Sequence, residues 1–459
     1  MYYLNGVYSP RSICAAVVDG ACVLAAFAIT WAVGPPPIAL AHYLLAAGVT
    51  VALTLGALFF NEAYRPETLG DGQRTLVSIL VTMGMGFAGA LLCYFGVPLP
   101  DGATPTMASI AAIMFPLLVV ARMFLRLSLG TRLLTINVVV IGATDLGLRV
   151  ARMLQDRSDT GIRMLGFLTD DRALHQHGAS YAGFRVLGRP HELEKILLDW
   201  DVDHIVVASK DRHEHFPADT LMLSKTRGVH VESGLSFLER LSGRVHMRDL
   251  RSSYLIFGPG FSCGPTYRLT RRALDVVGAT LLLFLAAPVL ALTALAIKLD
   301  SPGPILFRQR RLGKDDKPFM MNKLRSMCEN AESKSGAVFT SENDDRITRV
   351  GYFIRRTRLD ELPQLWNVLV GDMSLVGPRA ERPEFAETLH EIYPYYALRT
   401  TVRPGVTGWA QTRYGYVNSV EGYEEKLALD LYYLKYRSLF LDLVILAQTV
   451  KTVLHFRGM

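Results

Sequence analysis

The first quarter of the chain consists of apolar segments separated by short polar connections. They run roughly over residues 13–33, 38–60, 76–97 and 106–125. Each is close to the ~20 residues that an α-helix needs to cross the hydrocarbon core of a bilayer. Four buried helices of a soluble domain are the alternative. The pattern favours an N-terminal bundle of four transmembrane helices, within a membrane protein of mixed architecture.

The connections between these segments differ in their cations. Arg11 precedes the first segment, Arg65 and Arg74 lie between the second and third, and further arginines follow the fourth. The other two connections carry no Lys or Arg. Because cytoplasmic loops of membrane proteins are enriched in these residues, we expect the N-terminus and everything after residue 126 to be cytoplasmic. Asp19, inside the first segment, is expected to reach the interface or a neighbouring helix.

From Ile136 the pattern changes to short β-branched runs that alternate with amphipathic stretches. The runs include INVVVIG, MLGFLTDD, HIVVAS and GVHVES. This alternation is typical of βαβ units, with a mostly parallel sheet and helices on its faces. We therefore expect a central Rossmann-like α/β domain over residues 131–262.

The first turn of that domain reads GATDLG, with Thr144 where a dinucleotide-binding fingerprint has its central glycine. That glycine lets the backbone approach a pyrophosphate, so we favour a structural or regulatory domain, and nucleotide binding is the alternative. Asp170 and Asp171 follow the second predicted strand, where a ribose-binding acid would lie; they are turn residues on the other interpretation. The chain contains no Tyr-x-x-x-Lys, which weakens a short-chain dehydratase or epimerase assignment.

A further apolar segment, residues 279–299, has Pro288 near its middle and basic residues on both flanks. If the segment crossed the membrane, the cytoplasmic preference of Lys and Arg could not be met on both sides. Proline has no N–H to donate and clashes with the preceding turn, so Pro288 kinks or breaks the helix. Two halves of about 11 residues each reach only ~16 Å, roughly half the hydrocarbon thickness. We expect a re-entrant helical hairpin over about 274–299; a straight span with a tolerated proline is the alternative.

Composition supports contact with lipid. Hydrophobic residues make up 50% of the 459 residues and charged residues only 20%, a balance beyond that of ordinary soluble domains. The net charge of +7 suits an anionic membrane surface, nucleic acid or a phosphorylated substrate without choosing among them. The five cysteines form no CxxC pair, and we expect reduced thiols. The last apolar stretch, residues 438–456, is interrupted by Asp442 and Lys451, and we expect an interfacial or packed helix.

The richest chemistry lies in residues 355–385. Helical spacing of apolar side chains predicts a short amphipathic helix that ends near Gly371. The apolar positions are Leu362, Leu365, Trp366 and Leu369. Asp360 then lies at the N-cap, with Glu361 beside it and Pro363 in the first turn. A helix cap and a solvated surface would explain these residues without any chemistry.

The acidic pair of Asp360 and Glu361 is surrounded in sequence by cations. A helix N-terminus keeps a carboxylate ionised and attracts phosphate. An ionised Asp is a competent nucleophile toward phosphorus, and the neighbouring Glu could hold the Mg²⁺ that neutralises a pyrophosphate. The candidate phosphate-binding cations are Lys323, Arg325, Arg355, Arg356, Arg358, Arg379 and Arg403. Such a set suits phosphate clamping, whereas adjacent acids cannot easily flank a sugar ring as in glycosidases.

Residues 268–457 resemble the bacterial sugar transferase family, the polyprenyl-phosphate phosphoglycosyl transferases with a re-entrant membrane helix. The matching stretches are KLDSPGPILFRQRRLG, MNKLRSM, DDRITRVGYFIRRTRLDELPQLWNVLVGDMSLVGPR, VRPGVTGWAQ and DLYYLKYRSLFLDLVIL. The whole chain resembles the large membrane-bound branch that starts exopolysaccharide or capsule synthesis. We therefore expect a transmembrane region over 1–130 and a mainly α catalytic domain over 263–459, on either side of the α/β domain.

The resemblance implies a two-step reaction. The aspartate matching Asp360 attacks the sugar-linked phosphate of a UDP-sugar, UMP leaves, and undecaprenyl phosphate takes the hexose-1-phosphate from the enzyme. The glutamate matching Glu361 is implied as the ligand of a Mg²⁺ cofactor. The implied partners are a UDP-sugar, undecaprenyl phosphate and membrane lipid, with no nucleic acid, and a homodimer is left open. The implied location is the bacterial inner membrane, with several crossings and a cytoplasmic catalytic domain.

The chain departs from the family pattern at one position. Arg379 lies in the family's GPRP stretch, but Ala380 stands where proline is usual, so the rigidity of this loop is in question. Pro288 matches the family's helix-breaking proline. Asp430 matches an acidic position of the family, and a helix cap or an ion pair would also explain it.

Three other functions compete with this interpretation. A membrane-tethered nucleotide-sugar dehydratase or epimerase is suggested by apolar spans followed by a βαβ domain. A processive glycosyltransferase is suggested by the Asp-x-Asp pair of Asp201 and Asp203, for which a turn role is the simpler explanation. A non-catalytic assembly or regulatory protein is the third.

Overall fold

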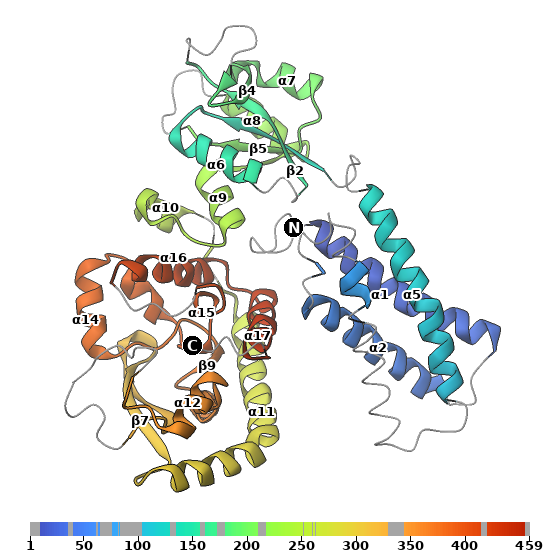
Figure 1. The fold of residues 1–459 in the computed structure, drawn as a ribbon. Coiled ribbons are helices and arrows are strands. Elements are labelled where there is room, and N and C mark those ends of the chain that lie inside the picture. The colour runs from blue at the N-terminus through green and yellow to red at the C-terminus, as the bar shows by residue number, and fades with distance from the viewer. Residues whose placement is uncertain are drawn as a thin grey trace. The chain divides into compact units, whose positions relative to one another are not determined.

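The computed structural model of the chain forms two compact units, Met1–Gly243 and Arg244–Met459 (Figure 1). The structure describes residues 10–34, 40–60, 63–64, 76–80, 82, 103–128, 135–156, 161–171, 180–209, 217–250, 252–258, 260–261, 263–328, 344–414 and 420–454. The expected division into domains 1–130, 131–262 and 263–459 stays a prediction. Cys14, Cys22, Cys263 and Cys328 are free thiols, as expected, and Cys93 lies outside the described residues.

Long apolar helices occupy the N-terminal part of the first unit: α1 (Pro10–Val33), α2 (Leu40–Phe60) and α5 (Ala103–Ser128). Ser12–Val33 and Ala108–Leu125 are long and apolar enough to cross a membrane, and Tyr43–Phe59 is a shorter apolar helix. The third expected segment, 76–97, lies mostly outside the described residues. Apolar helices of membrane type are therefore confirmed, whereas the four-helix bundle and its orientation stay predictions.

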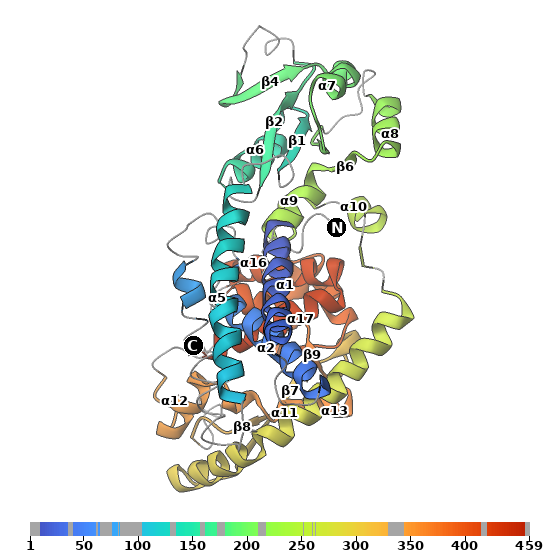
Figure 2. The same cartoon turned by 90° about the vertical axis from the view of Figure 1, so that its right-hand side faces the viewer.

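Helices α1 and α5 lie side by side (Figure 2) and share a buried ion pair. The guanidinium of Arg122 donates to both carboxylate oxygens of Asp19, at 2.6 and 3.1 Å, and to the carbonyl of Ala63 at 3.1 Å. Both charged side chains are almost fully buried. This confirms that Asp19 reaches a neighbouring helix, and paired charges of this kind are what an apolar bundle can tolerate.

The second part of this unit is a six-stranded sheet of order β3-β4-β2-β1-β5-β6. Its strands are β1 (Ile136–Ile141), β2 (Ile162–Leu168), β3 (Ser180–Tyr181), β4 (Phe184–Gly188), β5 (His204–Val207) and β6 (His230–Ser233). All neighbours are parallel except the edge pair β3 and β4. The helices are α6 (Asp145–Asp156), α7 (Leu193–Asp199), α8 (Ala218–Thr226) and α9 (Gly234–Ser242). The expected α/β architecture is confirmed.

Alternate side chains of β1 pack into two separate hydrophobic cores. Val138 and Val140 pack with apolar residues of α6 and α9, whereas Val139 and Ile141 pack with those of α7 and α8. Successive side chains of a strand point to opposite faces, so the sheet is covered on both sides. This burial explains why the strands read as continuous apolar runs.

The first turn of the sheet is filled by a side chain. Gly142 has φ 105°, and a Cβ there would lie 2.8 Å from the backbone nitrogen of Ser209. The hydroxyl of Thr144 donates to the carbonyl of Ala208 at 2.9 Å and accepts from the amide of Gly147 at 3.2 Å. Thr144 therefore cross-links the turn where a dinucleotide-binding domain keeps space for a pyrophosphate.

The acidic residues near this sheet have structural roles or are exposed. The Asp203 carboxylate accepts from the amide of Asn137, and the Asp201 carbonyl accepts from the Asn137 side chain, both at 2.8 Å. The Asp-x-Asp pair therefore has a structural role beside β1, in the short segment before β5. Asp170 and Asp171 are exposed directly after β2.

In the second unit, a 3₁₀ turn, η5 (Met247–Asp249), and the short helix α10 (Ser252–Phe257) precede helix α11 (Pro265–Asp300). Helix α11 contains Pro288 in its interior. Figure 1 shows that α11 bends sharply, and a proline inside a helix is a known cause of such kinks. The two separate halves expected from the sequence are therefore one bent helix of 36 residues, because a single proline removes one hydrogen bond and the ladder resumes after it. Re-entry into the membrane stays a prediction. Most of the apolar surface of α11 is exposed within the unit.

The rest of this unit is mainly helical. A hairpin of β7 (Leu306–Leu312) and β8 (Pro318–Leu324) is followed by α12 (Arg349–Arg356), α13 (Gln364–Val370), β9 (Ser374–Val376), α14 (Pro383–Ile392), β10 (Gly405–Thr407), α15 (Trp409–Arg413), α16 (Val420–Tyr436) and α17 (Leu439–Leu454). Asp442 of α17 is buried and accepts from the hydroxyls of Tyr433 and Tyr267 at 2.8 and 3.0 Å. Helix α17 is therefore a packed helix, as expected for its interrupted apolar sequence.

Candidate active site

The acidic pair lies in a tight turn between two helices. After α12, Arg358 takes the left-handed conformation with φ 57°, and a 3₁₀ turn, η7 (Leu359–Glu361), carries Asp360 and Glu361. Helix α13 then starts after its N-cap Pro363 and ends at Gly371, whose φ is 103°. The end at Gly371 is as expected. The N-cap position expected for Asp360 is wrong, because Pro363, with its fixed φ and missing N–H, starts the helix three residues later.

Helix α13 is fixed to the β7–β8 hairpin through one buried amide. The side-chain oxygen of Asn367 accepts from the backbone and side chain of Asn322 at 3.1 and 3.0 Å, and its nitrogen donates to the carbonyl of Met320 at 2.8 Å. These hydrogen bonds of Asn367, the Asn367 clip, hold Lys323, which follows Asn322 in β8, beside the acidic pair. Sequence analysis missed Asn367; its signal is a polar residue on the buried side of a short amphipathic helix.

Helix α11 holds the other end of α13. Arg272 donates to the carbonyls of Val368 and Leu369 at 2.7 and 2.8 Å, satisfying acceptors that a helix C-terminus leaves free. One turn further along α11, the buried carboxylate of Asp275 accepts from the hydroxyl of Ser374 and the amide of Leu375. The bent apolar helix is thus joined directly to the elements that carry the site.

Glu361 is the centre of a cluster of cations. Its Oε1 accepts from Arg379 at 2.8 Å and from Lys323 at 3.4 Å, and its Oε2 lies 3.5 Å from Arg358. Burial opposes ionisation of this carboxyl, but the charges of Arg379, Lys323 and Arg358 outweigh burial and hold its pKa well below the usual range. Contact with three cations therefore favours the ionised form of Glu361.

Asp360 has the opposite character. It is buried, and burial raises its pKa to about 6, with Lys323 acting against this shift and Glu361 adding to it. Among the described residues, no donor is hydrogen-bonded to its carboxylate. The dipole effect expected from the sequence is thus outweighed by desolvation. At pH 7 the ionised form still predominates, and a poorly solvated carboxylate without hydrogen bonds is a stronger nucleophile than one in water.

The predicted cations divide into two groups. Lys323, Arg358 and Arg379 contact the acidic pair, and Arg355 lies close enough to Asp360 to act on its pKa. Arg325 does not: its buried guanidinium donates to the carbonyls of Ser301 and Pro302 at 2.7 and 2.6 Å, fixing the end of α11. Arg356 and Arg403 are exposed. The sequence therefore included the three contacting cations among the candidates but could not separate them from the rest.

The residues fit a Mg²⁺ ion that is shared with a substrate. Mg²⁺ in phosphoryl-transfer sites is bound by one or two carboxylates and by substrate phosphates rather than by a closed protein cage. Asp360 and Glu361 are adjacent carboxylates of this kind, and the cations around Glu361 lower its pKa and so favour its ionised form. The donor set therefore suits a metal that arrives with a pyrophosphate.

Within the described part of the chain, one other group has the spacing of metal ligands. His204, His230 and Glu232, on β5 and β6, place their donor atoms within 4.8 Å of one another. However, the Glu232 carboxylate is already bonded by Arg240 and lies 2.7 Å from Nε2 of His204. Arg240 supplies the positive charge that this partly buried carboxylate needs, so we assign these residues to the packing of the sheet.

Comparisons with known proteins match two families. The model of a bacterial sugar transferase matches residues 266–456, and that of a CoA-binding domain matches residues 41–214. The first match includes every residue of the acidic pair and its cations. The second covers part of the apolar helices and most of the six-stranded sheet.

Several relatives are named as undecaprenyl-phosphate sugar phosphotransferases. The UDP-N-acetylgalactosamine-undecaprenyl-phosphate N-acetylgalactosaminephosphotransferase of Aeromonas hydrophila is 43% identical over 47% of this chain and 50% of its own length. Relatives named UDP-glucose:undecaprenyl-phosphate glucose-1-phosphate transferase also match, among them those of two further bacteria. The one from Caulobacter vibrioides is 48% identical over 40% of this chain and 70% of its own length. The one from Xanthomonas campestris is 30% identical over 69% of this chain and 66% of its own length. The chain thus spans only half the length of the A. hydrophila relative.

Proposed function

Because the chain belongs to the bacterial sugar transferase family, we propose that it transfers a hexose-1-phosphate from a UDP-sugar to undecaprenyl phosphate and releases UMP. The observation that carries this proposal is the pairing of two adjacent carboxylates with opposite properties. Asp360 is buried and has no donor bound to it among the described residues, whereas Glu361 is ionised and contacts three cations. This arrangement suits a nucleophile beside a phosphate-binding site.

In the first step an oxygen of Asp360 attacks the phosphorus that carries the sugar. A bond forms between this oxygen and phosphorus, the bond from phosphorus to the oxygen of UMP breaks, and UMP leaves with the electron pair. The product is an aspartyl phosphosugar. Burial of Asp360 favours this step because it removes water from the attacking oxygen.

In the second step a phosphate oxygen of undecaprenyl phosphate attacks the same phosphorus. The bond to Asp360 breaks, the carboxylate is restored, and the sugar is left on a lipid diphosphate. No proton has to be moved in either step, provided that the attacking and leaving oxygens are all anionic. The site accordingly needs cations rather than a general base, and histidine is absent from the turn that carries the acidic pair.

The cations now bound to Glu361 would stabilise the transferred phosphate. Lys323, Arg358 and Arg379 converge on one carboxylate, and their donors can turn to phosphate oxygens, for which a guanidinium fork is well suited. A Mg²⁺ ion held by Glu361 would neutralise the developing charge on the leaving UMP. Asp360 and Glu361 thus have separate roles, attack and charge control.

Exposed apolar side chains on α11 and its neighbours support a position of the site at the membrane surface. α11 exposes a long apolar surface, and α12 and α13 expose apolar side chains close to the acidic pair in sequence. These are Tyr352, Phe353, Trp366 and Val370. We propose that α11 enters and leaves the inner membrane by its cytoplasmic face, so that the acidic pair meets both a soluble nucleotide and a lipid phosphate.

The test is release of UMP from UDP-glucose and UDP-N-acetylgalactosamine in detergent, with undecaprenyl phosphate and Mg²⁺ present. We expect release with at least one donor, and loss of release in Asp360→Asn. Formation of a keto-sugar or an epimer without UMP would instead support a dehydratase or epimerase. Neither matching family nor the relatives named above have that activity in their names.

A further inference from the structure

The loop that carries Arg379 is held at every carbonyl over residues 378–381. Each of these carbonyls accepts a hydrogen bond of 2.9 to 3.1 Å from a different part of the unit. In chain order the donors are the Gly405 amide to Pro378, the Arg399 guanidinium to Arg379, the Arg311 guanidinium to Ala380 and the Leu312 amide to Glu381. Two of these donors are side chains that reach the loop from elsewhere in the fold.

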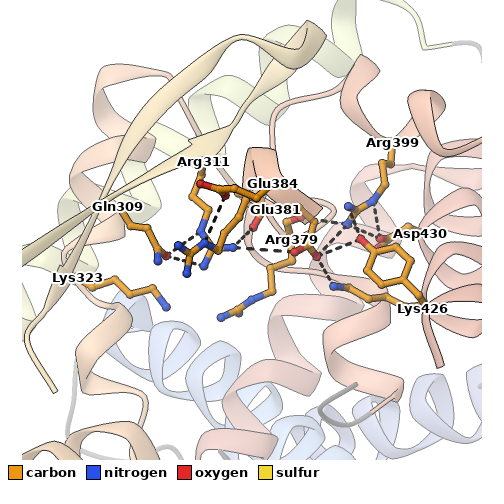
Figure 3. Close-up of polar contacts among 12 residues, drawn as sticks. Gln309, Arg311, Lys323, Arg379, Glu381, Glu384, Arg399, Lys426 and Asp430 are labelled. Atoms are coloured by element: carbon orange, nitrogen blue, oxygen red, sulfur yellow. Dashed lines mark hydrogen bonds and ion pairs between the residues drawn. The ribbon is translucent and has the colours of Figure 1, made fainter. Parts of the chain in front are cut away.

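Arg399 is anchored before it reaches the loop. Its side chain is buried, and it donates to the carboxylate of Asp430 at 2.9 and 3.2 Å and to the hydroxyls of Tyr423 and Tyr396 at 2.7 and 3.0 Å. Figure 3 shows Arg399 and Asp430 next to Glu381. A buried charge needs a complete set of partners, and the set of Arg399 includes the carbonyl of Arg379.

Glu381 ties the next residue of the loop to the same network. Its carboxylate accepts from Lys426 and, at 3.1 Å, from the hydroxyl of Tyr423. Burial opposes its ionisation, but Lys426 and Arg399 lower its pKa to about 2. Glu381 is therefore charged at every working pH, and the side of the loop away from the acidic pair is fixed by charge.

Arg311 holds the loop from the hairpin. Its Nε and one terminal nitrogen donate to the side-chain oxygen of Gln309 at 2.9 and 2.6 Å, and its other nitrogen donates to the carbonyl of Ala380 at 3.1 Å. Phe307, which precedes Gln309 by two residues, pairs directly with Lys323 on β8. Because alternate residues share a face, Gln309, Arg311 and Lys323 lie on one face of the hairpin (Figure 3).

We propose that Arg311 and Arg399 are positioning residues that set the direction of Arg379, an inference that rests on the proposed function. Their donors reach the carbonyls of Arg379 itself and of Ala380, the residue after it. A proline there would fix its own φ near −65°, whereas Ala380 leaves that angle free. In this chain two guanidiniums supply, from outside the loop, the restraint that a proline supplies from within.

Loss of Arg311 would disturb the contact between Arg379 and Glu361. Ala380 is buried, so its carbonyl would be left without a donor, which is unfavourable for a buried acceptor. The peptide would then rotate toward water, and Arg379, one residue earlier, would lose its place on Glu361. Small displacements of a charged group in a phosphoryl-transfer site have large effects on rate.

A double-mutant cycle between Arg311 and Ala380 tests the proposal. We expect Arg311→Met to lower kcat/KM for UMP release about tenfold, a size typical of a misplaced catalytic group. In the Ala380→Pro background the same change should cost less than about threefold, since proline restrains the loop itself. Among the described residues no acceptor is bonded to the Ala380 amide, so proline removes no hydrogen bond there.

The control is Arg310→Met, the adjacent arginine on the other face of β7, which is exposed and should leave kcat/KM unchanged. If Arg311→Met cannot be purified as a folded protein, Arg311→Lys, which keeps the charge and loses the fork, takes its place in the cycle. Equal losses in both backgrounds, or no loss at all, would overturn the positioning role. A wild-type protein that releases no UMP would instead refute the proposed function.

Discussion

The guanidinium of Arg379 donates to Oε1 of Glu361 across 2.8 Å, although the two residues are 18 positions apart in sequence. The bond joins the turn that carries the acidic pair to the loop that follows β9. It holds one of the three cations of the site on a carboxylate that has the charge of a phosphate oxygen. In the proposed reaction, a phosphate oxygen of the substrate would replace this carboxylate as the acceptor of Arg379.

Replacing Arg379 should lower the catalytic efficiency of the enzyme with its UDP-sugar substrate. We expect Arg379→Gln to lower kcat/KM for the UDP-sugar by about 10- to 100-fold, as for loss of a charge-assisted hydrogen bond. Arg379→Lys should retain part of this, because it keeps the charge without the fork. The matched control is Arg349→Gln on the exposed start of α12. Wild-type kinetics for Arg379→Gln would remove this residue from the phosphate site.

Mg²⁺ should act through Glu361. We expect chelation to abolish UMP release and Mg²⁺ to restore it. In Glu361→Gln, which keeps the shape but not the charge, the Mg²⁺ concentration at half-maximal rate should rise by about tenfold or more, since a metal-binding carboxylate is lost. A titration of rate against Mg²⁺ measures this shift. An unchanged half-maximal concentration would place the metal on other ligands.

The pH dependence should report Asp360. Because burial raises the pKa of Asp360 to about 6 and Glu361 stays ionised, the rate should fall below pH 6 by about tenfold per pH unit, with a slope of one. A plot of log kcat/KM against pH measures the slope. A slope of two, or a plateau down to pH 4, would contradict these assignments.

The raised pKa of Asp360 also makes the stability of the fold depend on pH. The folded pKa of Asp360 lies above its usual value of 3.8, so ionisation between about pH 4 and 6 destabilises the fold, by as much as about 3 kcal/mol. Asp360→Asn should therefore raise the Tm in detergent above pH 6 and leave it unchanged below pH 4. A lower Tm for Asp360→Asn at pH 8 would contradict the buried, unbonded carboxylate.

The topology of α11 can be tested by labelling. In a variant without its five native cysteines, a cysteine at Lys317, on the exposed side of the hairpin after α11, should be protected from an impermeant thiol reagent in intact cells. Gly34→Cys, at the far end of α1, should be labelled. Labelling at both positions would show that α11 crosses the membrane and would exclude re-entry.

Local pattern was sufficient for much of the fold. The apolar helices, the βαβ domain and the helix that ends at Gly371 follow from periodicity, capping and glycine, which act within a few residues. Adjacency was also enough to propose the acidic pair. Lys323, Arg358 and Arg379 were included because cations near an acidic pair in sequence were assumed to be near it in space, which holds for these three and fails for Arg325.

Other features depend on contacts that no local pattern contains. The ion pair of Arg399 and Asp430, 31 positions apart, and the Asn367 clip exist only after the chain has folded. Burial of Asp360 depends on the β7–β8 hairpin and on α12, which lie outside the local sequence pattern. The sequence alone therefore could not show that desolvation has a larger effect on the pKa of Asp360 than a helix N-terminus has. Pro288 was predicted to disrupt α11, but the balance between a kink and a break is set by tertiary packing.

The most direct test of the covalent mechanism is exchange of labelled UMP into the UDP-sugar without undecaprenyl phosphate. If the proposed aspartyl phosphosugar forms reversibly, wild type should incorporate label and Asp360→Asn should not. A wild-type enzyme that exchanges label only after the lipid phosphate is added, or an Asp360→Asn variant that exchanges at the wild-type rate, would contradict attack by Asp360.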